Sequence, residues 1–140
     1  MIKFYKKCVA PLAALMLFPT LSFAQSIQKP SSIIGTWENP RASVKVTTSR
    51  CGTDICGYVT WANAMAAKDA HDAGTEHLVG TKLLENYIQT SPRGWHGHVF
   101  VPDLRSRYYS NIAQLNSDEI KISGCILGGW ICKSQIWHRT

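Results

Sequence analysis

The sequence predicts an all-β fold: a small eight-stranded antiparallel barrel in which consecutive strands run up and down. Two observations carry this prediction. After residue 33, almost every segment is short, rich in Val, Ile, Tyr, Trp and Thr, and bounded by turn residues, which is typical of β-strands. Two pairs of cysteines also bracket short turns, as they do in hairpins. Such a meander tends to close into a barrel, because closure removes the exposed strand edges.

The first 24 residues are expected to form a secretory signal peptide. A lysine-bearing head precedes the apolar run of residues 9–21, and the small residue Ala24 suits a cleavage site. Cys8 lies inside this leader, so it is left out of the cysteine pairing. The apolar run is too short for a spanning helix and no comparable run follows it. We therefore expect a mature chain without a transmembrane segment, located in the periplasm or secreted.

The charge of the chain gives no sign of a nucleic-acid partner. Removing the leader with its three lysines lowers the formal net charge from +6 to about +3. The remaining basic residues are scattered along the sequence, whereas nucleic-acid binders usually concentrate them on one face. Residues 25–33 are expected to form a polar tether, and residues 34–140 suit a single domain. The core of so small a domain is modest, so covalent cross-links would help to stabilise it.

Turn residues and alternating patterns locate the strands in chain order. The eight strands are expected at residues 34–38, 42–50, 55–62, 81–89, 95–101, 107–115, 119–126 and 131–139. The one long loop, residues 63–77, is rich in alanine and has room for a helical turn. Long loops of compact domains often form functional lids or mouths.

A disulfide is expected between the last two strands. Gly128 and Gly129 suit a two-residue hairpin turn, which places Leu127 opposite Trp130 and the two flanking cysteines opposite each other. Residues directly opposed in a hairpin lie about 4.5–5.5 Å apart at Cα, which a disulfide accepts. The sequence therefore predicts a bridge between Cys125 and Cys132.

The same reasoning predicts a second bridge, between Cys51 and Cys56, around a turn at Thr53-Asp54. Four mature cysteines allow three connectivities, and two local matches favour these pairs. Zinc prefers closely spaced, reduced thiolates, whereas an exported chain enters an oxidising compartment. Each bridge closes a short loop and is expected to stabilise the fold by about 2–2.5 kcal/mol.

Strand alternation then divides the side chains between the two faces of the sheet. If the sulfurs point to solvent, their neighbours along each strand point inward. The inward residues of the two hairpins are then Val44, Val46, Thr48, Val59, Trp61, Ile120, Ile122, Gly124, Ile126, Ile131, Lys133, Gln135 and Trp137. This wall is apolar except for a few polar side chains, among them one lysine.

Lys133 separates two hypotheses about the interior. A lysine in an apolar wall is costly unless it is paired or hydrated, so either its head reaches one mouth of the barrel or it meets an anion or a wet cavity. A small, partly apolar or anionic ligand would then contact Lys133, Gln135, Trp61, Trp137, Arg105 and Arg107. The alternative is a filled barrel that serves as a structural or protein-interaction module of the envelope, without a ligand.

The two ends of a meander differ, because its turns alternate between them. One end is expected to gather Arg41, Lys68, His71, His77, Arg105, Arg107 and Trp130, and would form the mouth. The other end joins the first strand to the last and brings Trp37 to Arg139. An arginine stacked on an indole would close this end by a cation–π contact.

Several motifs carry a family resemblance. Gly35-Thr36-Trp37 and the final Arg139 resemble the G-x-W motif and last-strand arginine of lipocalin-type barrels. Together with CG-YVTW, LVGTKLL, GWHGHVFVPD and ISGCILGGWICKSQIWHR, they resemble the exported bacterial family called domain of unknown function 2147. The resemblance implies a lipocalin-like barrel in the envelope, without an established activity. Arg105 and the long loop depart from the family pattern at the proposed mouth, so a ligand preference is not implied.

No metal, cofactor or catalytic activity is predicted. His96 and His98 share one face of a strand, but two imidazoles without a third ligand are more often a solvent-facing pair. The acidic residues and histidines of the 63–77 loop supply ligand types without a ligand spacing. The sequence has no nucleophile elbow, H-E-x-x-H motif or glycine-rich phosphate loop, so we do not expect an enzyme.

Overall fold

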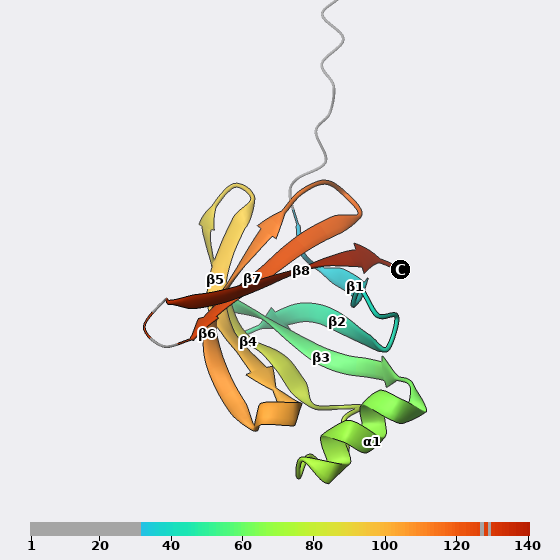
Figure 1. The fold of residues 1–140 in the computed structure, drawn as a ribbon. Helices are drawn as coiled ribbons and strands as arrows, with labels where there is room; N and C mark the ends of the chain where they lie inside the picture. The colour runs from blue at the N-terminus through green and yellow to red at the C-terminus, as the bar shows by residue number, and fades with distance from the viewer. Residues whose placement is uncertain (1–31, 127, 129) are drawn as a thin grey trace, which may run out of the picture.

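The computed structural model describes residues 32–126, 128 and 130–140, and it shows a closed barrel of eight antiparallel strands. Each strand pairs with the next one in the chain, and the last pairs with the first (Figure 1). The elements are β1 Gly35–Glu38, β2 Val44–Cys51, β3 Asp54–Ala62, α1 Ala64–Asp72, β4 Lys82–Ser91, β5 Gly94–Val101, the 3-10 turn η1 Pro102–Leu104, β6 Ser106–Gln114, β7 Glu119–Ile126 and β8 Ile131–Arg139. The predicted fold class is confirmed. The expected signal peptide with Cys8, and the expected tether as far as residue 31, lie outside the described residues.

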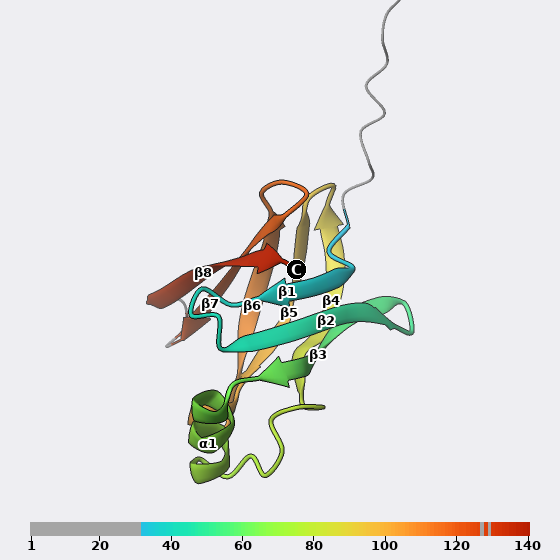
Figure 2. The same ribbon diagram turned by 90° about the vertical axis from the view of Figure 1, so that its right-hand side faces the viewer.

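Helix α1 and the turn η1 lie at the same end of the barrel, below the strands in Figures 1 and 2. The helix begins after Asn63, whose side-chain oxygen accepts a hydrogen bond of 2.8 Å from the backbone N–H of Ala66. Asparagine is a preferred residue at this capping position, and the alanines that follow favour a helix. The expected helical turn in the long loop is thus a helix of nine residues.

Strand β8 is only partly covered by β1. The two strands pair at Trp37 with Arg139 and at Glu38 with His138, because β1 is only four residues long. The first half of β8, which includes Lys133 and Gln135, therefore extends past β1 and has its strand pairing with β7. This half of β8 forms one side of the open end of the barrel.

The disulfide of the last hairpin joins the predicted pair of cysteines, at a Cα–Cα distance shorter than the expected range of about 4.5–5.5 Å. Cys125 lies directly opposite Cys132, with a Cα–Cα distance of 4.0 Å, and Gly124 lies opposite Lys133. The pairing of Leu127 with Trp130 and the turn at Gly128-Gly129 involve positions 127 and 129, which lie outside the described residues.

The first disulfide is present as predicted, but its hairpin has a different register. Cys51 lies opposite Asp54, so the turn consists of Gly52 and Thr53 rather than Thr53-Asp54. Gly52 adopts a φ of 71°, which a residue without a Cβ accepts most easily. Cys56 is consequently a diagonal neighbour of Cys51, at a Cα–Cα distance of 5.7 Å. A register shift of two residues leaves the faces unchanged, so both cysteines remain on the outer face, although Cys56 is fully buried there.

The hydrophobic core fills the barrel interior and reaches Ala70 of α1. Among its largest fully buried side chains are Trp37, Tyr87, Ile33, Leu84, Ile112 and Ile120. Ile33, which was expected to belong to the tether, has no exposed surface, and its carbonyl accepts hydrogen bonds from Trp37 and Thr48. The folded domain therefore begins before residue 34.

Candidate functional site

The end opposite α1 is closed by Trp37 and Arg139. The guanidinium carbon of Arg139 lies 4.2 Å from the centre of the Trp37 ring, and the indole is fully buried. Gly35 lies beneath the arginine with a φ of 150°, and a Cβ at this position would overlap the guanidinium. Glycine is therefore needed at position 35 for a steric reason, because the Arg139 side chain crosses β1 at this residue.

A buried polar pair lies further along the interior. The Tyr87 hydroxyl donates a hydrogen bond of 2.8 Å to the Ser110 hydroxyl, and both residues are almost completely buried. Burial disfavours the charged phenolate and raises the pKa of Tyr87 to about 12. The Tyr87 ring packs over Gly97, where a Cβ would lie 2.9 Å from two ring carbons. This part of the interior is filled by protein.

The interior is hollow toward the other end. A cavity of about 330 Å³ lies between η1, the ends of β4 to β6 and the β7–β8 hairpin. Its lining is mostly apolar and consists of Leu83, Val99, Val101, Leu104, Tyr108, Ile122, Gly124, Ile131, Lys133, Gln135 and Trp137. This volume falls at the lower end of the range of roughly 300–1,000 Å³ found for small-molecule sites.

Three of the six predicted ligand contacts line this cavity, and all three are on β8. Lys133 and Gln135 are also exposed to solvent, whereas Trp137 is buried at 7% exposure. The indole N–H of Trp137 donates to the side-chain oxygen of Gln135 at 3.1 Å, which orients the amide. Within the described part of the chain, the Lys133 ammonium forms no ion pair or hydrogen bond. The cavity therefore combines an apolar wall with a cation that reaches both the cavity and water.

Trp61 does not line the cavity, and its predicted role as a wall is wrong. The pairing of β2 with β3 passes from Lys45–Trp61 to Val46–Val59, so Thr60 is an extra residue in a β-bulge. A bulge of one residue reverses the face of the residues beyond it. Trp61 is consequently 43% exposed, and the Lys45 ammonium lies 5.7 Å from the centre of its ring on the outer surface.

The two predicted arginine contacts also lie elsewhere. The Arg107 guanidinium points outward, where its Nε donates to both carboxylate oxygens of Glu85 at 2.9 Å. Arg105 is at the α1 end as expected, but its guanidinium packs beside Gly74, which follows the helix, and does not line the cavity. The prediction placed both arginines at the mouth because they lie at the turn that leads into β6. The alternation along β6 instead turns Tyr108 inward and Arg107 outward.

Sequence reasoning missed several cavity residues. Tyr108 shares its face of β6 with the buried Ser110 and Ile112, so the alternation alone identifies it as an inward residue. Leu104 enters the lining from η1, a turn whose geometry could not be read from strand alternation. Val99 lies on the face of β5 opposite His96 and His98, so the alternation that turns the histidines outward also turns Val99 into the cavity wall.

His96 and His98 lie on the outer face of β5, as expected from their spacing. Tyr109 lies between them, with ring centroids 5.8 Å and 6.0 Å from the two imidazoles. Across residues 32–126, 128 and 130–140, no group of three or more His, Cys, Asp or Glu side chains is arranged as a metal site. In the same residues, no helix is long and apolar enough to cross a membrane.

Comparison with known proteins agrees with this architecture. Residues 35–139 match the protein family described as "Uncharacterized protein conserved in bacteria (DUF2147)". No curated protein matches the chain. The solved structure described as "Protein HP1028 from the human pathogen Helicobacter pylori belongs to the lipocalin family" superposes with a TM-score of 0.59 at 16% sequence identity. The alignment covers 79% of this chain and 84% of that chain. At this identity the likeness concerns the fold, a lipocalin-like barrel.

Proposed function

The chain belongs to the bacterial family DUF2147, and on that premise we propose that it is an exported envelope protein that binds a small, partly apolar anion in its barrel. The observation that carries this proposal is the cavity of about 330 Å³ with the Lys133 ammonium at its edge. An apolar wall with a few placed polar groups is the usual composition of a small-molecule site.

The electrostatics of the cavity favour a ligand with a negative charge at one end. Lys133 is the charged residue of the lining, and it has no carboxylate partner among the described residues. A carboxylate or sulfonate placed beside it would gain a charge-assisted hydrogen bond. The amide nitrogen of Gln135 is free to donate to the same group, because Trp137 bonds to the amide oxygen. The aliphatic and aromatic walls would then surround the apolar remainder of the ligand.

Export is supported by the cysteines and by the leader-like N-terminal sequence. Each disulfide joins two residues of its own hairpin. Disulfides persist in an oxidising compartment and are rare in the cytosol. The first 24 residues have the head, apolar run and small-residue end of a secretory signal. We therefore place the protein in the periplasm or outside the cell.

Binding is tested with a fluorescent amphiphilic anion, 1-anilinonaphthalene-8-sulfonate, titrated into the purified oxidised protein. We expect saturable binding that is weakened about fivefold to tenfold in Lys133→Gln, because the charge-assisted contact is lost. Lys121→Gln removes the same charge from the outer face of β7 and serves as the matched control. Equal weakening in both variants, or an absence of saturation in the wild type, would contradict the proposal.

A further inference from the structure

A second hollow lies on the outer surface of the barrel and is separate from the cavity. It has a volume of about 290 Å³ and is lined by Lys82, Glu85, Asn86, His98 and Arg107, from β4, β5 and β6. None of these residues lines the internal cavity. The hollow therefore needs its own explanation.

An irregularity in β4 creates this hollow. The pairing of β4 with β5 shifts between Glu85 and Ile88, and Asn86 adopts a left-handed backbone with a φ of 52°. As a result, two consecutive residues, Glu85 and Asn86, line the same outer surface, whereas the next residue, Tyr87, is buried. A non-glycine residue in this conformation is uncommon and is often found at functional sites.

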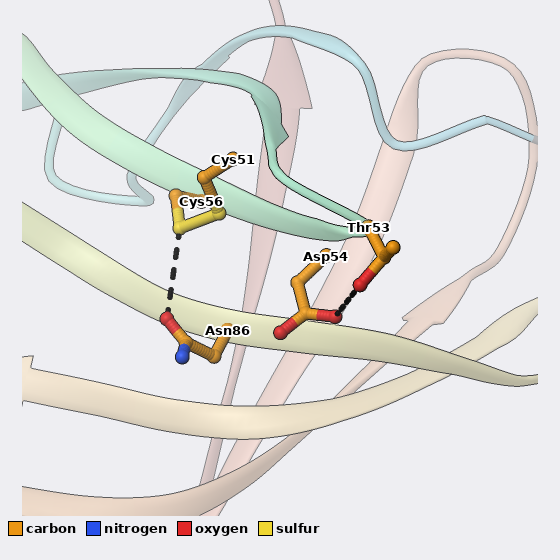
Figure 3. The surroundings of a disulfide bond; sticks show 5 residues. All are labelled: Cys51, Thr53, Asp54, Cys56 and Asn86. Carbon is orange, nitrogen blue, oxygen red and sulfur yellow. Dashed lines mark hydrogen bonds between the residues drawn. A yellow bond between two sulfur atoms is a disulfide. The ribbon is translucent and has the colours of Figure 1, made fainter.

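The disulfide of the first hairpin supports the irregular segment from behind. The Asn86 side-chain oxygen lies 3.8 Å from the Cys56 sulfur, and the amide nitrogen points away from the bridge (Figure 3). Because a bridged sulfur carries no hydrogen, this approach is a packing contact. It fixes the position of the Asn86 amide at the edge of the hollow.

The hollow carries more donor groups than negative charge. Glu85 is the negatively charged residue of its lining, and both carboxylate oxygens accept from Nε of Arg107 at 2.9 Å. Within the described residues, the two terminal amino groups of Arg107 have no hydrogen-bond partner, and neither the Lys82 ammonium nor the His98 ring forms a hydrogen bond. Lys82 and Arg107 against Glu85 leave a net charge of +1, without counting His98. A bound molecule would therefore have to supply acceptors and negative charge.

We propose that the side chains of Lys82, Asn86, His98 and Arg107 in this outer hollow form a binding site for an oxyanion, such as the phosphate group of a small molecule, with Glu85 holding the arginine in place. The fork of the guanidinium and the lysine ammonium suit the oxygens of such a group. Aromatic rings flank the two cations: Lys82 lies 5.7 Å from the Tyr58 ring, and Arg107 lies 5.1 Å from the Phe100 ring. These cation–π contacts help to hold the two cations beside the hollow.

The test is a titration of the full mature, oxidised protein with inorganic phosphate, followed by NMR of the backbone amides. We expect saturable shifts at Asn86, His98 and Arg107, and no such shifts with sodium chloride at the same ionic strength. Lys82→Gln is expected to weaken phosphate binding about tenfold, because one charged donor is lost. Lys121→Gln, which removes a lysine from β7, should change the affinity less than twofold.

A second variant separates geometry from charge. Arg107→Lys keeps one positive charge near Glu85 but removes the fork, so we expect phosphate binding to weaken severalfold. Lys133→Gln should leave phosphate binding unchanged, because this lysine belongs to the internal cavity. Equal shifts in chloride, or unchanged affinity in both Lys82→Gln and Arg107→Lys with retained thermal stability, would overturn the proposal and leave the cavity hypothesis unaffected.

Discussion

Arg139, near the end of the chain, stacks on Trp37 in the first strand, with its guanidinium carbon 4.2 Å from the centre of the indole ring. The same guanidinium donates hydrogen bonds to the carbonyls of Ser117, Ile34 and Ser32 at 2.7, 2.9 and 3.3 Å. One side chain thus connects β1, the β6–β7 loop and β8. The seam between the first and last strands has only two paired positions, so this contact is central to closing the barrel.

Replacing Arg139 by alanine is expected to lower the free energy of unfolding by about 2–4 kcal/mol, since both the cation–π contact and the charged hydrogen bonds are lost. Arg139→Lys should recover less than half of this loss, because an ammonium cannot reach three carbonyls from over the ring. Urea denaturation measures both variants, with the exposed Arg93→Ala as a control. A loss below about 0.5 kcal/mol in Arg139→Ala, the size usual for surface substitutions, would contradict this account of the seam.

Gly97→Ala is expected to destabilise the fold by about 1–3 kcal/mol, which is typical of an extra methyl group in a packed interior. Its Cβ would lie 2.7 Å from the Glu85 carbonyl oxygen and 2.9 Å from the Tyr87 ring. Gly124→Ala is the matched control, because its Cβ faces the cavity with its nearest neighbours at 3.7 and 3.9 Å. Thermal unfolding compares the two. Equal melting temperatures would mean that Tyr87 does not pack against β5 as described.

Each disulfide should contribute about 2–2.5 kcal/mol, because each closes a short loop of the unfolded chain. Replacing Cys125 and Cys132 together by alanine is expected to lower the free energy of unfolding by that amount. Replacing Cys51 and Cys56 together by alanine should lower the free energy of unfolding by more than this, since Cys56 is fully buried and contacts Asn86. Chemical denaturation of the two double variants checks the order, and a smaller effect at the buried bridge would contradict it.

The raised pKa of Tyr87 predicts that the folded protein loses stability in alkaline solution. Its pKa is raised to about 12 by burial in the folded protein, whereas an unfolded tyrosine ionises near 10. The raised pKa means that the unfolded state releases its proton first, so the free energy of unfolding decreases above pH 10, by about 1.4 kcal/mol per pH unit, up to pH 12. Urea denaturation at pH 8 to 11 measures the slope in the wild type and in Tyr87→Phe. The difference in free energy of unfolding between the wild type and Tyr87→Phe should decrease with rising pH. A constant difference would contradict a raised pKa of Tyr87.

The sequence predicted most of the fold because its signals are local. The strands β7 and β8 have the expected bounds, and both disulfides formed as expected, since cysteine spacing and strand alternation depend on a few neighbouring residues. The inward positions of Lys133 and Gln135 follow from the same alternation in the last hairpin. For that reason the polar part of the cavity could be located before the fold was known.

The positions of Trp61 and Asn86 could not be predicted in this way. Each depends on a β-bulge, and a bulge is a property of two paired strands rather than of one sequence segment. Thr60 looks like an ordinary strand residue until its partner strand shows that it has no opposite residue. The bulge in β3 places Trp61 on the surface instead of in the interior. The bulge in β4 creates the outer hollow.

The most direct test of the central claim is native mass spectrometry of the oxidised protein purified from bacteria without denaturation. We predict a species heavier than the oxidised mature chain by the mass of one small molecule. We also predict its loss in Gly124→Leu, whose side chain would fill the cavity while leaving the barrel folded. A wild-type mass equal to that of the oxidised chain alone, or the same additional mass in Gly124→Leu, would contradict the proposed binding of a ligand inside the barrel.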